Sequence, residues 1–358
     1  QLRETDVIAR LGGDEFMILL ESFDNIESVA RIAKKLVQEL SMPFVLEQSN
    51  DVRIGTSIGI CIYPEHGNSV EQLMDHADMA LYLAKDNGRG CFAYFTEGLT
   101  QIAREKLHLE ARLRAAIKNQ ELRVFYQPQV DIESGQIVGA EALVRWQDPD
   151  NGLVSPDQFI PIAEETGLII SLGEWVLREV CHQGKQWLDQ GLPKITLAVN
   201  VSPRQFEANT IVEYVTQVLE ETNFPADLLE LEVTEGSLMQ NQEEAVEVLN
   251  QLRILGVRFA MDDFGTGYSS LAYLKRFPLD VLKIDKSFID NIPYDESDME
   301  ITATIISMGR NLQITVLAEG VETAEQLDFI KKKGCASYQG YYKSKPLNAE
   351  AFVALLTS

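Results

Sequence analysis

The sequence lacks long hydrophobic runs, is poor in cysteine and has a deficit of positive charge. No apolar stretch approaches the roughly 18–20 residues that cross a bilayer, and the first residues do not resemble a signal peptide. The four cysteines lie far apart without a CxxC pair. This spacing argues against a disulfide framework or a zinc cluster and fits a reducing cytoplasm, where we expect this part of the protein.

The formal net charge of −24 disfavours a nucleic acid polymer as partner, because the protein would repel the phosphate backbone. A small phosphate-bearing ligand, held through a metal ion, stays compatible with this charge. The four histidines do not cluster with the carboxylates in the sequence. Any metal site is therefore expected to consist mainly of oxygen ligands, with some Asn.

Apolar runs and amphipathic helical patterns alternate from about residue 120 to the end. The apolar runs lie at 123–130, 137–146, 195–201, 228–234, 257–262, 281–284, 314–317 and 336–340. The helical patterns lie at 171–190, 211–221, 243–255, 299–311, 324–332 and 349–356. This alternation predicts a parallel sheet, closed or open. The turn around Ser134 is too short for a crossover helix, so the first two strands should be antiparallel.

Polar side chains stand at the carboxyl ends of these predicted strands. Asp262 and Asp263 repel each other as neighbours, and a cation would lower that cost. Carboxylate oxygens favour Mg²⁺ or Mn²⁺ over zinc. A solvated Asp-Asp turn explains this pair alone equally well. In a (β/α)₈ barrel, however, strand ends converge on one face. Seven strands carry such residues: Glu141, Asn200, Glu232, Glu235, Asp262, Asp263, Lys283, Asp285, Glu319, Glu322 and Gln339.

The first 95 residues predict a small α/β unit with too few elements to close a core. A hairpin turns at Gly12 and Gly13, helical patterns cover 26–40 and 70–85, and strands are expected at 52–63 and 91–95. We therefore expect residues 1–95 to be the C-terminal portion of a truncated domain. A helical pattern then runs over 96–120, so residues 96–110 connect this unit to a second domain at 111–358.

The string Gly12-Gly13-Asp14-Glu15-Phe16 resembles the signature of the GGDEF (diguanylate cyclase) family. Further segments that resemble the family follow at residues 57–60, 77–82, 84–85 and 88–89. Arg3 and Asp6 resemble the family's RxxD product-inhibition motif. The resemblance implies that the turn cradles GTP and that Asp14 binds metal. The family's other metal ligand and its guanine contacts would lie upstream, so this fragment is not expected to be a competent cyclase.

The stretch Glu141-Ala142-Leu143-Val144-Arg145-Trp146 resembles the signature of the EAL family of cyclic di-GMP phosphodiesterases. Further matches occur in order at 126–128, 159–161, 200–203, 232–235, 262–267, 283–285, 318–322 and 339–341. The resemblance implies a modified TIM (β/α)₈ barrel with one antiparallel strand, here preceded by a partial α/β GGDEF-type domain. It also implies metal-dependent hydrolysis of cyclic di-GMP to linear 5′-pGpG by a water activated by two metal ions.

The same resemblance implies residue roles. Two ions, Mg²⁺ or Mn²⁺, would be held by Glu141, Asn200, Glu232, Asp262, Asp263 and Glu319. The catalytic set would be Glu141, Glu319, Lys283, which positions the water, Gln339, and Glu235, which anchors a metal-responsive loop at 264–270. Substrate contacts would come from Gln127, Leu143, Arg145, Asp285 and Glu322. Lys283 could also be a structural lysine paired with Asp285 or Asp263, and both roles could hold because several anions would keep it charged. Lys343 stands where an apolar residue is common, and we expect a modest effect.

Three other functions compete with this one. The barrel could be a non-catalytic cyclic di-GMP receptor, but such members lose metal ligands and none is missing here. GTP binding to the complete GGDEF domain could regulate the barrel, or the substrate could be pGpG itself. We expect a homodimer, and an upstream sensor or membrane anchor in the full-length protein is compatible with this sequence.

Overall fold

The computed structural model describes residues 6–21, 23, 26–42, 54–149, 152–207, 210–240, 242–265, 274 and 276–357. The chain divides into two compact units, Gln1–His108 and Leu109–Ser358. Arg3 and residues 266–270 of the expected metal-responsive loop lie outside the described residues. Within the described part of the chain, no helix is both long and apolar enough to cross a membrane.

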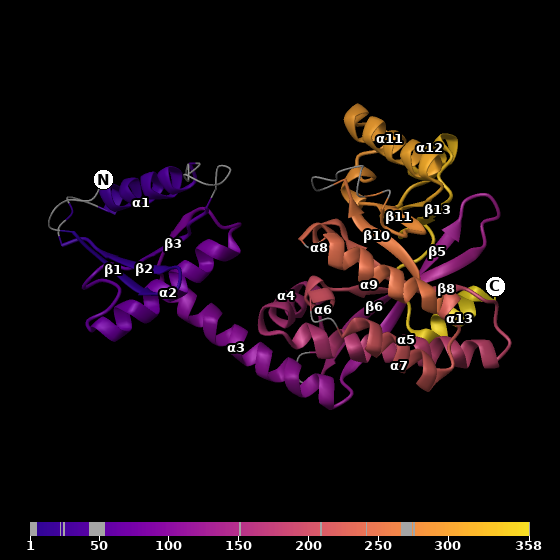
Figure 1. Cartoon of the computed structure of the whole chain (residues 1–358), viewed down its shortest axis with the longest axis horizontal. Helices are drawn as coiled ribbons and strands as arrows, with labels where there is room; N and C mark the ends of the chain where they lie inside the picture. The colour runs from indigo at the N-terminus through magenta and orange to yellow at the C-terminus, as the bar shows by residue number, and fades with distance from the viewer. Residues whose placement is uncertain are drawn as a thin grey trace. The chain divides into compact units, whose positions relative to one another are not determined.

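The first unit contains the hairpin and the two helices that the sequence predicts (Figure 1). Strands β1 (Val7–Gly12) and β2 (Glu15–Leu19) are antiparallel, while the short strands β3 (Ile58–Ile60) and β4 (Phe92–Tyr94) are parallel. The helices are α1 (Ile26–Leu40) and α2 (Val70–Asp86), the latter capped by the side chain of Ser69. Nearly every described side chain of the hairpin is exposed, so its apolar residues add little to the core of this unit.

The second unit is a closed eight-stranded barrel, which confirms the predicted modified TIM barrel. Its strands are β5 (Leu122–Asp131), β6 (Ile137–Asp148), β8 (Thr196–Val201), β9 (Leu229–Thr234), β10 (Arg258–Phe264), β11 (Val281–Ile284), β12 (Thr315–Ala318) and β13 (Ser337–Gln339). Strand β5 closes the barrel by pairing antiparallel with both β6 and β13, and the remaining barrel pairs are parallel. The short turn around Ser134 therefore forces the antiparallel pairing that the sequence predicts.

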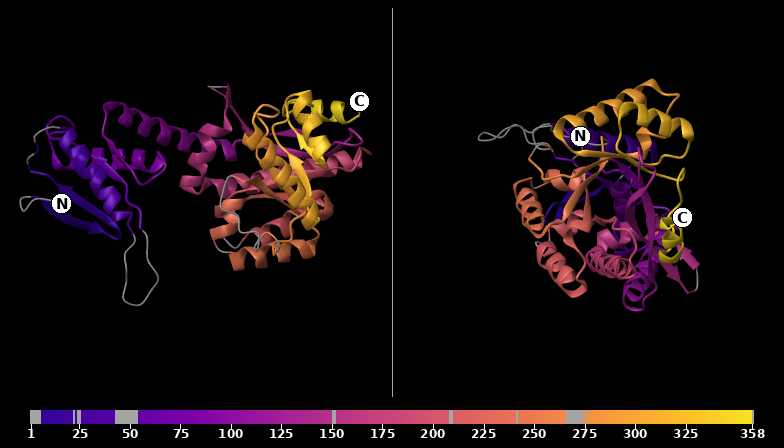
Figure 2. Two further views of the ribbon diagram at one scale, coloured as in Figure 1. Left: turned by 90° about the horizontal axis from the view of Figure 1, so that it is seen from above. Right: turned by 90° about the vertical axis from the view of Figure 1, so that its right-hand side faces the viewer.

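Helices surround the barrel strands (Figures 1 and 2). They are α4 (Pro156–Thr166), α5 (Leu168–Asp189), α6 (Pro203–Glu207), α7 (Ile211–Thr222), α8 (Glu235–Gln240), α9 (Gln242–Leu255), α11 (Glu296–Leu312), α12 (Ala324–Lys333) and α13 (Ala349–Leu356). Helix α3 (Glu97–Lys118) spans the division between the units in the sequence. Helix α4 and the edge strand β7 (Gly152–Val154) are not predicted by the sequence pattern. Helix α4 starts at Pro156 and contains Pro161, and prolines at this spacing obscure a helical pattern.

A small apolar layer made of Ala260, Val281 and Leu317 fills part of the barrel interior. Side chains alternate along a strand, so residues two places further on point to the same side. Those residues are Asp262, Lys283 and Glu319, at the carboxyl ends of β10, β11 and β12. The polar side chains at the strand ends thus lie next to this apolar layer.

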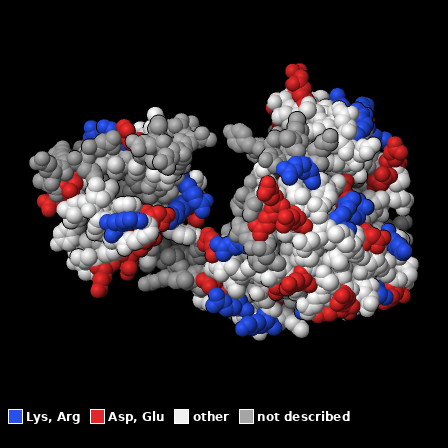
Figure 3. Space-filling model, in the orientation of Figure 1, with Lys and Arg blue, Asp and Glu red and all other residues white. Residues whose placement is uncertain are grey.

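On the outer surface, acidic and basic side chains are interspersed over the face shown in Figure 3.

Helix α13 covers β5 through an aromatic cluster. The ring of Phe352 stacks on Trp187 at 5.4 Å between centroids and lies 5.8 Å from the ring of Tyr126.

We expect Phe352→Ala to lower the free energy of unfolding by about 3–5 kcal/mol, because it empties a fully buried site. Urea unfolding measures this change. Ile254→Ala, at a side chain that is 86% exposed, should change stability by less than about 0.5 kcal/mol, and equal effects would contradict this packing.

Candidate functional site

Lys283 lies at the centre of the carboxyl end of the barrel and is fully buried. Its Nζ lies 2.7 Å from Glu232 Oε2, 2.8 Å from Glu319 Oε1, 3.1 Å from Asp262 Oδ1 and 3.7 Å from Glu141 Oε2. These acids come from β9, the residue after β12, β10 and β6. One cation therefore joins four carboxylates that are far apart in the sequence.

Two amide side chains fix the carboxylate of Glu141. Asn200 Nδ2 donates to Glu141 Oε1 at 2.7 Å, and Gln339 Nε2 donates to Glu141 Oε2. The same Gln339 nitrogen also donates to Gln127 Oε1 at 3.2 Å. Since Gln127 lies on β5 and Gln339 on β13, all eight barrel strands, or the residue directly after one of them, contribute to the cluster.

Burial and like charge dominate the electrostatics of the cluster. Burial raises the pKa of Glu232 well above its usual range, and the neighbouring Glu141 raises it further. The pKa of Glu319 rises to about 8, mainly through burial. Burial alone would lower the pKa of Lys283, but the surrounding carboxylates, Asp262 foremost, outweigh it and raise this pKa well above its usual range. The surrounding carboxylates thus favour the ammonium form of Lys283, which suits a hydrogen-bond donor better than a general base.

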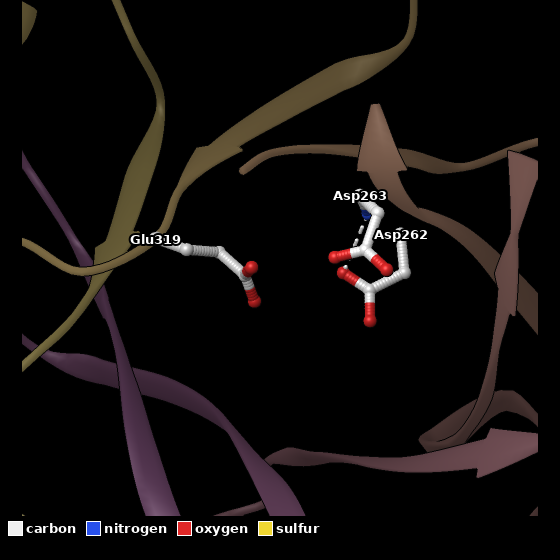
Figure 4. A group of neighbouring side chains, drawn as sticks. All are labelled: Asp262, Asp263 and Glu319. Atoms are coloured by element: carbon white, nitrogen blue, oxygen red, sulfur yellow. Dashed lines mark hydrogen bonds between the residues drawn. The ribbon is translucent and has the colours of Figure 1, made fainter. Parts of the chain in front are cut away.

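Asp262, Asp263 and Glu319 form a compact group of oxygen atoms. Each residue offers a carboxylate oxygen, and these oxygens lie within 4.8 Å of one another. Figure 4 shows the three carboxylates turned toward one shared space. Asp263 has a left-handed backbone with φ of 54°, and its N–H donates to Asp262 Oδ1 at 3.0 Å. Aspartate tolerates this conformation better than most residues, and strain of this kind gathers at functional sites.

The donor set fits a divalent cation. Glu232 Oε1 and Gln339 Oε1 are buried acceptors without a hydrogen-bond donor among the described residues. Leaving such an acceptor unsatisfied costs about 1–3 kcal/mol, so its retention here favours a bound ion or water. The available ligand atoms are carboxylate and amide oxygens, which match hard ions such as Mg²⁺ and Mn²⁺.

Family models match both parts of the chain. The EAL domain model matches residues 110–346, and the model of the diguanylate cyclase GGDEF domain matches residues 1–91. The chain belongs to the EAL domain family. Its N-terminal unit is a GGDEF-type fragment, as the sequence predicts.

Several relatives share the whole EAL and GGDEF arrangement of this chain. The bifunctional diguanylate cyclase/cyclic di-GMP phosphodiesterase MucR of Pseudomonas aeruginosa is 43% identical over 99% of this chain and 51% of its own length. The cyclic di-GMP phosphodiesterase PdeR of Escherichia coli is 40% identical over 98% of this chain and 52% of its own length. The chain thus spans about half the length of these curated relatives.

Solved structures agree with the EAL barrel. A structure titled PaMucR phosphodiesterase, c-di-GMP complex, has a TM-score of 0.67 at 43% identity and covers 68% of this chain and 99% of that one. The EAL domain of DcpA from Mycobacterium smegmatis has a TM-score of 0.58 at 34% identity and covers 66% of this chain and 97% of that one.

Asp285 and Glu322, two of the residues that the EAL resemblance implies, are held by neighbours rather than by Lys283. The side chain of Asp285 accepts from Ser287 N at 3.0 Å and caps a short 3₁₀ turn, so Lys283 pairs with acids other than this one. Glu322 accepts from Lys286 at 2.9 Å. Glu235 opens α8 and is buried, and its Oε2 has no hydrogen-bond partner among the described residues.

Arg145 and Leu143 lie on β6 beyond Glu141, and both are partly buried. The guanidinium of Arg145 donates to Val144 O at 2.8 Å and lies 5.8 Å from the ring centre of Phe125. These contacts orient the Arg145 side chain without a carboxylate partner among its hydrogen bonds in the described structure. An arginine held in this way suits an anionic ligand.

In the GGDEF fragment, Asp6 precedes β1, and Gly12, Gly13, Asp14 and Glu15 form the exposed hairpin turn. Gly13 has φ of 50°, which explains a glycine at this position. Sequence reasoning missed Arg10, whose Nε donates to Gly13 O at 3.0 Å and closes the turn. Only the three-dimensional pairing of β1 with β2 reveals this contact.

We expect Lys283→Met to destabilise the metal-free protein by about 3–5 kcal/mol at neutral pH, because four acids lose their shared cation. Urea unfolding in EDTA measures the loss, which should shrink as pH falls and the acids become protonated. Lys332→Met removes an exposed lysine paired with Asp328 and should cost at most about 0.5 kcal/mol. Equal stability of the two variants would refute the role of Lys283.

The raised pKa of Glu319 predicts a pH-dependent stability without metal. The folded protein retains the Glu319 proton up to a pKa of about 8, whereas the unfolded chain releases it near the ordinary pKa of 4.5. The stabilisation is therefore fully present below pH 4.5 and is lost as pH rises through 8. We expect Glu319→Gln to flatten the fall in stability between pH 5 and 8, measured by urea unfolding in EDTA. Glu325→Gln, at an exposed residue, should keep the wild-type slope.

Proposed function

We propose that the EAL barrel is a phosphodiesterase that hydrolyses cyclic di-GMP to linear 5′-pGpG with two divalent cations, Mg²⁺ or Mn²⁺. The observation that carries this proposal is the set of acid and amide side chains gathered around the buried Lys283. The names of MucR and PdeR, and of the MucR structure with cyclic di-GMP, support the substrate.

Two groups of residues would hold the ions. Glu141, Asn200, Glu232 and Asp262 would bind one ion, and Asp262, Asp263 and Glu319 would bind the other. When bound, two such ions supply a nucleophilic water at neutral pH and stabilise negative charge at the phosphate. The buried, unsatisfied Glu232 Oε1 and the Asp262, Asp263 and Glu319 oxygens within 4.8 Å of one another support this assignment.

The protein's own side chains orient the reactants. Lys283 would act as a donor that positions the attacking water, because its ammonium stays charged among the acids. Gln339 and Asn200 hold Glu141 in one orientation from both sides. Arg145, Gln127 and Leu143 would contact phosphate and base, with Asp285 and Glu322 at the rim. Glu235 would anchor the loop at 264–270.

The proposed hydrolysis balances as follows. The water oxygen forms a bond to phosphorus, the bond from phosphorus to the ribose 3′ oxygen breaks, and that oxygen receives a proton. The ring opens to a linear dinucleotide with a 5′-phosphate. No redox partner or further co-substrate is needed.

The receptor alternative is disfavoured because every acid and amide expected to bind metal is present and faces the same cluster or its edge. We further propose that residues 1–95 are not a competent cyclase in this chain, that 96–110 connect the units and that the barrel begins at 111. Regulation by GTP, a homodimer, an upstream sensor and a cytoplasmic location remain proposals for the full-length protein.

Incubation of the purified chain with cyclic di-GMP and Mg²⁺, beside a sample in excess EDTA, tests the proposal by chromatography of the products. We expect pGpG only with Mg²⁺. Tight binding of cyclic di-GMP without cleavage would instead support a non-catalytic receptor. Cleavage of added pGpG in preference to cyclic di-GMP would instead support the third alternative.

Glu141→Ala should lower kcat by at least about 100-fold, because it removes a ligand that both amides orient. Product chromatography under saturating substrate measures kcat. Glu133→Ala, in the exposed turn between β5 and β6, is the matched control and should retain wild-type turnover. Wild-type turnover of Glu141→Ala would overturn the metal assignment.

A further inference from the structure

Tyr341 stands two residues beyond Gln339, at the edge of the site, and its side chain is 52% exposed. Two ammonium groups lie on its ring. Lys286 Nζ is 5.9 Å from the ring centre and Lys345 Nζ is 5.2 Å from it. The roles proposed above use none of these three side chains. We call Tyr341, Lys286 and Lys345 the rim cluster.

The backbone on either side of Tyr341 is fixed. Val321 N donates to Gln339 O at 3.1 Å, and Tyr342 N donates to Val321 O at 2.9 Å. A Cβ atom on Gly340 would lie 2.1 Å from Val321 O, so only glycine allows this approach. Tyr341 is thus held in a defined place next to Gln339, which itself contacts Glu141.

The two lysines of the rim cluster differ in their partners. The stem of Lys286 packs on Gly320, where an added Cβ would lie 2.3 Å from Lys286 Cγ. Its ammonium pairs with Glu322 at 2.9 Å and Asp290 at 3.7 Å. For Lys345, by contrast, no carboxylate lies within ion-pair distance among the described residues. Lys345 therefore offers its charge to a ligand, whereas Lys286 is already neutralised.

The rim cluster also reaches toward Arg145. Burial lowers the pKa of Arg145, and the Tyr341 hydroxyl and the Glu141 carboxylate partly oppose that effect through their proximity. Tyr341 thus lies within electrostatic range of both Arg145 and Lys345. A cyclic dinucleotide carries two phosphates, of which only one is cleaved. In a protein of net charge −24, an uncompensated cation at this edge is suited to the other phosphate.

We propose that Lys345, held over the ring of Tyr341, binds the phosphate of the cyclic dinucleotide that is not cleaved. This inference rests on the proposed function. The contact is made equally before and during the reaction, so it should act on KM and leave kcat unchanged. Lys345 is a binding residue under this proposal and takes no part in the chemistry.

The test is steady-state hydrolysis of cyclic di-GMP by Lys345→Gln. An exposed ion pair predicts an increase in KM of about three- to fivefold at low ionic strength with unchanged kcat. The increase should diminish at high salt, because salt screens exposed charges. Tyr341→Leu should raise KM in the same direction, and Tyr341→Phe should resemble wild type because it keeps the ring.

Lys333→Gln is the matched control. Lys333 also lies over an aromatic ring, 5.4 Å from the centre of Phe329, but it ends α12 and precedes β13. It therefore belongs to the opposite end of the barrel from the strand carboxyl ends. Lys333→Gln removes the same charge and should keep the wild-type KM.

The outcomes separate this inference from the proposed function. If the wild type cleaves cyclic di-GMP and Lys345→Gln matches Lys333→Gln, this inference alone is wrong. A fall in kcat at unchanged KM, or a change confined to inhibition by added pGpG, would also overturn it. If the wild type binds without cleavage, the dissociation constants of the same variants replace KM. If it neither binds nor cleaves cyclic di-GMP, both proposals fail.

Discussion

The ammonium of Lys283 and the four carboxylates around it form the interaction on which the site depends. Separately, each buried acid would protonate or destabilise the barrel, because an unpaired charge in the interior costs several kcal/mol. Together with one cation, they remain close enough to act as a ligand set. The result is a cluster with more negative than positive charge, which favours the binding of divalent cations.

The barrel makes this arrangement possible. Parallel strands end on the same face, and antiparallel β5 brings Gln127 to that face beside Gln339 of β13. The layer of Ala260, Val281 and Leu317 lies below and supports the charged groups with apolar packing. The amide groups of Asn200 and Gln339 donate hydrogen bonds to the two oxygens of Glu141, which adds to the interaction of this carboxylate with Lys283. These hydrogen bonds join side chains of different strands across the barrel interior.

The site and its rim use lysine in two different ways. Lys283 is buried and surrounded by acids, so its charge holds these acids together, and in the proposed reaction it would position the water. Lys345 is exposed and lies on the ring of Tyr341, where its charge remains available to an anion. Burial and the number of nearby carboxylates would thus separate the positioning role that we propose for Lys283 from the binding role that we propose for Lys345.

Much of this protein is determined by its sequence alone. The order of apolar runs and helical patterns predicts a parallel sheet, closed or open, and the EAL resemblance implies that it closes into a barrel. The short turn at Ser134 dictates the antiparallel pair because no crossover helix fits there. The acids at the strand ends predict that the site lies at the carboxyl end of the barrel. This prediction is possible because the alternation of side chains along a strand and the direction of the strand can both be read from the local sequence. Helix α4 is not predicted because its two prolines are more typical of a turn than of a helix.

The partners of individual side chains were decided only by the tertiary structure. From the sequence, a purely structural Lys283 is expected to pair with Asp285 or Asp263. The fold places Lys283 among Glu141, Glu232, Asp262 and Glu319, and the Asp285 side chain caps a turn instead. No sequence pattern predicts the contacts of the rim cluster either. Both depend on closure and register of the whole barrel, which bring residues from distant strands within a few ångströms. Local sequence fixes which face a side chain occupies, but only closure of the barrel fixes what it meets there.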